Sequence, residues 1–122
     1  GVLDWEMATI GDPLMDLGNS LAYWIEADDE GPFQMLRRQP THRPGMLTRK
    51  EVVDYYMKKS GFRAEKFDFY EIYGLFRLAV IIQQIYYRFY HGQTKDKRFA
   101  AFGHAANYLE KRCQRLISES TL

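Results

Sequence analysis

The 122-residue chain is long enough for one domain with a hydrophobic core and too short for two. Its single cysteine, Cys113, excludes an internal disulfide framework and fits a cytoplasmic protein, and no apolar run is long enough to span a membrane. Residues 1–36 hold eight acidic residues and no basic one, whereas all 17 basic residues follow, spread along predicted helices in a way that does not favour nucleic-acid binding.

The chain opens with Val2-Leu3-Asp4-Trp5-Glu6, in which apolar and acidic residues alternate. Such alternation is typical of a half-buried strand, and it would place Asp4 and Glu6 on one face. Two neighbouring carboxylates repel each other unless a cation lies near them, and a divalent ion would relieve that repulsion. The spacing alone leaves two interpretations open, a metal site and a solvated strand end.

Asp12 and Pro13 predict the start of a helix, with Asp12 as the N-cap and Pro13 at the first helical position. We expect this helix to end near Glu26. Its apolar residues recur at three- and four-residue spacings, which predicts one buried stripe made of Leu14, Leu17, Leu21 and Trp24. Asp16 falls in the first turn, where a carboxylate interacts favourably with the helix dipole. Capping therefore explains Asp12 and Asp16 without any catalytic role.

Residues 27–47 contain three prolines and two glycines, which predicts a long connection with at most a short helical turn near 33–37. The acidic run Glu26 to Glu30 at its start would suit a cationic ligand, although acidic loops are commonly only solvated. Thr48 and Glu51 form a capping-box pattern, so a second helix should begin there and stop at Ser60-Gly61.

The segment from Phe67 to Tyr90 is apolar on nearly every face, which predicts a long helix buried on most sides. Its polar residues Arg77, Gln84, Arg88 and His91 form one narrow stripe that faces either solvent or a polar cleft. Arg77 lies in so apolar a setting that we expect it to have a carboxylate partner. A last helix should run from Asp96 to Ser118.

The ordered segment Leu3-Asp4-Trp5-Glu6, Gly11-Asp12-Pro13-Leu14 and Asp16-Leu17-Gly18 resembles the metal-binding segment of the aminoglycoside phosphotransferase and choline kinase superfamily. Within that superfamily it is most similar to phosphotransferases related to the kinase domains fused to acyl-CoA dehydrogenases. The resemblance implies a protein-kinase-like fold, of which this chain would be the mainly α, helical C-terminal subdomain with a short N-terminal β segment. It would form a single helical domain over residues 1–122.

The resemblance also implies roles for individual residues. Asp4 would ligate Mg²⁺ on the phosphates of ATP, and Glu6 would assist in the metal site. Asp16 would hydrogen-bond backbone amides of the catalytic loop, so that it and Asp12 support the active site structurally. The side chains that we name for contact with a small hydroxyl-bearing substrate are Trp24, Glu26, Asp28 and Arg77.

The catalytic loop, the glycine-rich loop and the strand lysine of kinases have no counterpart in this sequence, so no catalytic residue is assigned in this chain. We therefore expect the C-terminal part of an ATP-dependent small-molecule kinase that transfers the γ-phosphoryl group to an alcohol and is inactive as the isolated chain. The alternative is a non-catalytic helical interaction module. In either case an orphaned hydrophobic surface would allow the chain to form a homo-oligomer.

Overall fold

The structure, a computed structural model, describes residues 3, 6 and 8–120. Its elements are α1 (Pro13–Leu21), α2 (Gly31–Gln34), α3 (Arg49–Ser60), α4 (Asp68–Tyr90), the 3-10 helix η2 (Lys97–Ala101) and α5 (Phe102–Glu119). The predicted mainly α fold is confirmed. The β segment expected over residues 2–6 lies largely outside the described residues, and the described Leu3 and Glu6 are both exposed.

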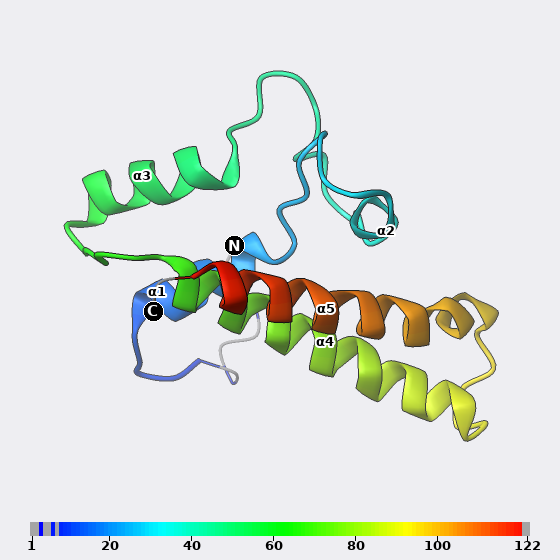
Figure 1. The fold of residues 1–122 in the computed structure, drawn as a ribbon. Coiled ribbons are helices and arrows are strands. Elements are labelled where there is room, and N and C mark those ends of the chain that lie inside the picture. The colour runs from blue at the N-terminus through cyan, green and yellow to red at the C-terminus, as the bar shows by residue number, and fades with distance from the viewer. Residues whose placement is uncertain (1–2, 4–5, 7, 121–122) are drawn as a thin grey trace.

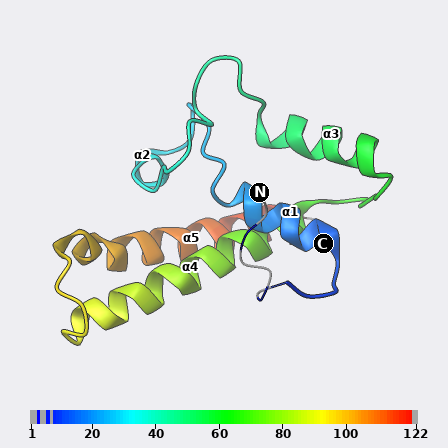
Figure 2. The ribbon, with the colours of Figure 1, turned by 180° about the vertical axis from the view of Figure 1, so that it is seen from behind.

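Helices α4 and α5 lie side by side in antiparallel orientation, and α1 packs across the N-terminal part of α4 (Figures 1 and 2). The core lies where these three helices meet the residues that follow α1. Leu109 of α5 and Ile25 and Phe33 of the connection are its most deeply buried large side chains. No helix in the described part of the chain is long and apolar enough to cross a membrane.

Helix α1 begins as predicted, because the Asp12 side chain accepts a hydrogen bond from the backbone of Leu14 and Pro13 occupies the first turn. It ends at Leu21, earlier than the predicted end near Glu26. After Leu21 the amides of Tyr23 and Trp24 donate to the carbonyls of Ser20 and Leu21, three residues back, so the α-helical hydrogen bonding has already stopped. The carbonyls of residues 24–26 then accept hydrogen bonds from side chains elsewhere, namely Arg49, Thr41 and Gln34. Tertiary contacts thus replace the helical ladder at these residues.

Helix α3 begins and ends as its sequence predicts. Thr48 and Glu51 form the complete capping box, and Gly61 closes the helix in the left-handed conformation with a φ of 82°. The helix stands away from the α4–α5 pair, and non-helical segments join it to the rest of the chain on both sides (Figures 1 and 2). Only Val53 of its residues is buried.

The expectation that α4 is buried on most sides is wrong for one of its faces. Leu75, Leu78 and Ile82 are buried, but Phe76 is 60% exposed and Tyr87 is 56% exposed. Because α5 and α1 cover only part of the α4 circumference, the remaining apolar side chains have no covering element in the described chain. The last helix also differs from prediction in its first turn, which is the 3-10 helix η2 capped by Asp96.

Candidate functional site

Asp4, the principal residue of the predicted metal pair, lies outside the described residues. Its expected companion Glu6 is exposed. Among the residues that the structure describes, no three histidine, cysteine, aspartate or glutamate side chains gather closely enough to hold a metal ion. The metal role of Asp4 and Glu6 therefore stays a prediction. Residues 8–19, which follow this segment, are described and show how it is attached to α4.

Asp12 connects this segment to α4 as well as capping α1. One of its carboxylate oxygens accepts from the backbone of Leu14 at 2.9 Å, and the other accepts from the Tyr70 hydroxyl at 2.8 Å. The hydrogen bond to Asp12 raises the pKa of Tyr70, because the hydroxyl that donates to a carboxylate is harder to ionise. Asp12 therefore fixes the end of the N-terminal segment to the first turn of α4.

A groove of about 490 Å³ runs between α1 and α4, directly beside this segment. Asp12, Asp16, Asn19, Tyr73 and Arg77 supply its polar lining. The carboxylate of Asp16 is on the exposed side of α1, and the Oδ1 atom of Asn19 is buried without a hydrogen-bond partner in the described chain. The groove thus brings two predicted support residues, Asp12 and Asp16, together with the predicted substrate residue Arg77.

In the part of the chain that the structure describes, Arg77 has no carboxylate partner of the kind that its sequence setting predicted. No acidic oxygen of the described residues lies within 4.0 Å of its guanidinium, and the side chain is exposed. The other members of its stripe, Gln84, Arg88 and His91, are exposed too. The apolar neighbours that suggested burial lie on other faces of α4, so Arg77 points into the groove and solvent without needing an internal counter-ion.

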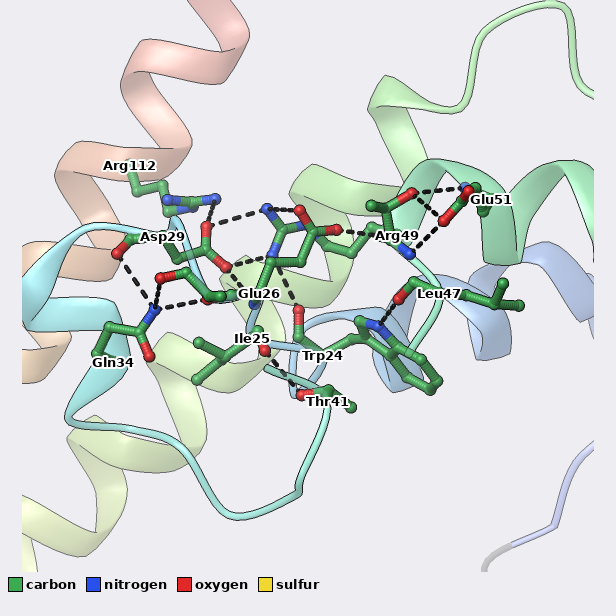
Figure 3. Close-up of polar contacts among 12 residues, drawn as sticks. Trp24, Ile25, Glu26, Asp29, Gln34, Thr41, Leu47, Arg49, Glu51 and Arg112 are labelled. Atoms are coloured by element: carbon green, nitrogen blue, oxygen red, sulfur yellow. Dashed lines mark hydrogen bonds and ion pairs between the residues drawn. The ribbon is translucent and has the colours of Figure 1, made fainter. Parts of the chain in front are cut away.

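Trp24 and Glu26, also predicted to contact substrate, hold α3 in place in the structure (Figure 3), and their role in substrate contact stays a prediction. The Trp24 indole donates to the carbonyl of Leu47 at 2.8 Å, and the Trp24 carbonyl accepts from the Arg49 guanidinium at 2.9 Å. The Glu26 carboxylate accepts from the backbone amide of Arg49 and lies 3.7 Å from its guanidinium. These polar groups are occupied by contacts within the chain. Asp28, the third predicted residue of this region, is exposed.

Asp29 is an acidic residue with a buried side chain, and the sequence predicted no individual role for it. Its side chain is only 5% exposed and it bridges two helices, accepting from Arg49 of α3 at 2.5 and 3.0 Å and from Arg112 of α5 at 3.1 Å (Figure 3). It also accepts from the backbone of Glu26 at 2.8 Å. In the sequence Asp29 is one of several acids in a loop, and nothing local distinguishes it from Asp28.

Arginines surround Asp29 and determine its ionisation. Burial acts to raise the pKa of the Asp29 carboxyl, but the hydrogen bonds from Arg49 and Glu26 and the two guanidinium charges outweigh it, so the pKa lies below its ordinary value. Arg112 is itself buried and stacks over the Phe33 ring at 4.5 Å.

The neighbouring Glu30 continues this pairing. Its carboxylate accepts from the Tyr108 hydroxyl at 2.8 Å and forms an ion pair with Arg115 at 2.8 Å. Three of the four acids in the run 26–30 are therefore matched by arginines of the same chain. The acidic loop that would have suited a cationic ligand is largely neutralised from within.

Comparison with known proteins places the chain near phosphotransferases. Residues 1–51 match the model of the phosphotransferase enzyme family. The chain is 35% identical over 100 residues to acyl-CoA dehydrogenase family member 10 from Mus musculus, a match that covers 78% of this chain and 9% of that protein. It is 32% identical over 100 residues to the probable acyl-CoA dehydrogenase IBR3 from Arabidopsis thaliana, covering 77% of this chain and 12% of that protein. No solved structure matches. The chain thus spans about a tenth of the length of the curated relatives that it matches.

Proposed function

The chain resembles the phosphotransferase enzyme family over residues 1–51, and from that premise we propose that it forms the C-terminal part of an ATP-dependent small-molecule kinase. The matched segment contains Asp4, Glu6, Asp12 and Asp16, and this match is the single observation that carries the proposal. In this proposal the larger protein transfers the γ-phosphoryl group of ATP to a substrate hydroxyl, and the 122-residue chain alone does not turn over ATP.

Carboxylate oxygens are the protein ligands that Mg²⁺ prefers, so the donor chemistry of Asp4 and Glu6 fits the metal that such a kinase uses. When bound, Mg²⁺ would neutralise charge on the nucleotide phosphates. Asp4 would hold the ion, and Glu6 would assist it. Asp12 supports this arrangement by fixing the end of the segment to Tyr70 of α4 at 2.8 Å.

The groove between α1 and α4 supports a role in assembling the active site. Asp16 is an acceptor, and Arg77 and Tyr73 offer donors, within one groove of about 490 Å³ beside the matched segment. Backbone amides and carbonyls of a catalytic loop would satisfy both kinds of group. Arg77 would alternatively contact an anionic group of the acceptor substrate.

The acceptor is a small hydroxyl compound in this proposal, and the structure gives no support to recognition of a cationic acceptor by the acidic run. Arginines form ion pairs with Glu26, Asp29 and Glu30. Asp28 is the one acid of this run without such a pair in the described chain. A screen should therefore cover aminoglycosides, choline-like alcohols and hydroxyacyl-CoA compounds alike. ATP consumption by the full-length protein would be measured with each acceptor, and then repeated with Asp4→Ala.

A helical interaction module is a second candidate, favoured by one observation. Phe76 of α4 and Ile117 of α5 are 60% and 58% exposed, and both line a largely apolar groove of about 540 Å³. Sedimentation of the isolated chain tests this candidate, because self-association through this face would disappear in Phe76→Ser. A monomer at all concentrations would count against it.

A further inference from the structure

Residues 46–60, which we call the arm, comprise α3 and the short stretch before it. A segment with consecutive turns leads into the arm and a non-helical stretch, residues 61–67, follows it, and α3 stands apart from α4 and α5 (Figures 1 and 2). Val53 is its buried residue, and side chains such as Tyr55 are largely exposed. Hydrophobic burial therefore does little to hold the arm in its position.

A glycine with a positive φ precedes the arm and another follows it. Gly45 has a φ of 89° and Gly61 a φ of 82°, and a Cβ added at either position would meet no atom within 4 Å. Glycine adopts this backbone region without steric cost, and at these two positions no neighbouring atom packs closely against the Cα. In a hinge, a few residues absorb the change in backbone dihedral angles. Gly45 and Gly61 suit that role, because each flanks the arm and each tolerates a wide range of φ.

The polar contacts that fasten the arm converge at its N-terminal end. Arg49 donates to the Glu26 carboxylate, to the Trp24 carbonyl and to both oxygens of Asp29, while the Trp24 indole donates to Leu47 (Figure 3). Asp29 also accepts from Arg112 of α5. The buried Asp29 carboxylate therefore links the arm to α5, while Trp24 and Glu26 link it to the chain that follows α1.

A cleft of about 310 Å³ lies between the arm and the body. Val53 and Met57 of α3 face Leu21 of α1 and Phe67 across it, and Arg49 lies at its edge. Displacement of the arm would widen this cleft and expose its apolar lining. We propose that the arm is hinged at Gly45 and Gly61 and latched to α5 through Asp29, so that loss of the Asp29 contacts releases the arm and opens the cleft.

Release has a measurable consequence, because α3 has only 12 residues. A helix of about this length is marginal in water without tertiary contacts, so the detached arm would lose hydrogen-exchange protection. The test measures amide exchange of residues 52–60 in the full chain. Asp29→Asn removes the charge with little change in shape, and Asp28→Asn removes the same charge from the adjacent exposed position, making it the matched control.

Asp29→Asn should accelerate exchange in α3 at least tenfold and change α4 and α5 less than threefold, while Asp28→Asn should match the parent chain. Unchanged α3 exchange in Asp29→Asn would overturn the proposal. Equal acceleration in every helix would also overturn it, since Asp29 would then support the whole fold. If Asp29→Asn fails to fold, Arg49→Lys replaces it, because it keeps the charge and loses the two-oxygen contact. Faster exchange confined to α3 is again expected, and its absence contradicts the latch.

Discussion

Gly18 of α1 and Gly74 of α4 meet where the two helices cross, and neither position has room for a side chain. A Cβ on Gly74 would lie 2.1 Å from the carbonyl oxygen of Gly18, and a Cβ on Gly18 would lie 2.1 Å from the carbonyl oxygen of Tyr70. The obstructing atoms belong to the backbone, so they cannot turn aside as a flexible side chain could. The crossing therefore fixes how α1, and the matched segment that precedes it, sits on α4.

Alanine at either glycine should destabilise the fold, because α1 must move away from α4 to admit a methyl group. We expect Gly18→Ala and Gly74→Ala each to lower the free energy of unfolding by about 3 kcal/mol, the upper end of the usual range for overpacking. Gly31→Ala is the control, since a Cβ there meets nothing within 4 Å, and it should change stability by less than about 0.5 kcal/mol. Urea unfolding measures all three, and three equal values would contradict the packing argument.

Removing the Asp12 carboxylate should loosen both α1 and its connection to α4. Asp12→Ala loses the cap on Leu14 and the acceptor for Tyr70, and we expect a cost of about 1 kcal/mol from the cap alone. Asp28→Ala provides the comparison, because Asp28 is exposed outside any helix. The measurement is the midpoint temperature of thermal unfolding, which should be lower in Asp12→Ala than in Asp28→Ala. Equal midpoint temperatures would show that Asp12 contributes no more to stability than an exposed charge does.

The contacts of Asp29 should fail at acid pH. Since its folded-state pKa is lowered, its stabilising contribution is complete above the ordinary aspartate pKa of 3.8 and is lost as the pH falls through the lower folded value. Although burial acts to lower the pKa of the Arg49 guanidinium, the hydrogen bonds and charges of Asp29 and Glu26 raise it, so Arg49 stays charged throughout this range. Trp24 fluorescence reports the change, because its indole donates to Leu47.

In a Trp5→Phe background that leaves Trp24 as the only tryptophan, the fluorescence should shift below about pH 4, where aspartate begins to protonate. The same titration of Asp29→Asn should lack that shift and already resemble the acidic parent at pH 7. A parent and variant that titrate identically would show that another group is responsible.

Asp16 offers a way to separate structural from functional roles. It lies on the exposed side of α1, where its interaction with the helix dipole is worth about 0.3–1 kcal/mol. We therefore expect Asp16→Ala to cost the isolated chain no more than that, yet to reduce phosphoryl transfer by the full-length protein at least tenfold. The paired measurements are urea unfolding of the chain and turnover of the longer protein. Full activity in Asp16→Ala would remove Asp16 from the proposed site.

Local signals in the sequence predicted the ends of elements well where those ends are satisfied locally. Asp12 with Pro13, the capping box of Thr48 and Glu51, and the glycine at 61 each act within a few residues, and each prediction is confirmed. The long helix over residues 67–90 was predicted to within one residue because its apolar pattern is continuous.

Long-range contacts account for what the sequence did not predict. Helix α1 stops at Leu21, where the backbone changes to hydrogen bonds three residues back, and the carbonyls of Trp24 and Ile25 accept from Arg49 and Thr41 far along the chain. Asp29 looks like its neighbour Asp28 in the sequence, and only the arrival of Arg49 and Arg112 from two helices makes it a buried bridge. Arg49 also pairs with Glu26, a long-range contact that the local sequence does not show.

The most direct test of the proposed kinase function is ATP consumption by the full-length protein with Mg²⁺ and its best acceptor, compared between Asp4→Asn and Asp28→Asn. Both variants remove one acidic charge from the N-terminal third of the chain. We predict that Asp4→Asn lowers phosphoryl transfer by about 100-fold or more, as loss of a charge-stabilising group in an active site does, while Asp28→Asn keeps the parental rate. Full turnover in Asp4→Asn, or an equal loss in both variants, would contradict the assignment of Asp4 to the metal and with it the kinase proposal.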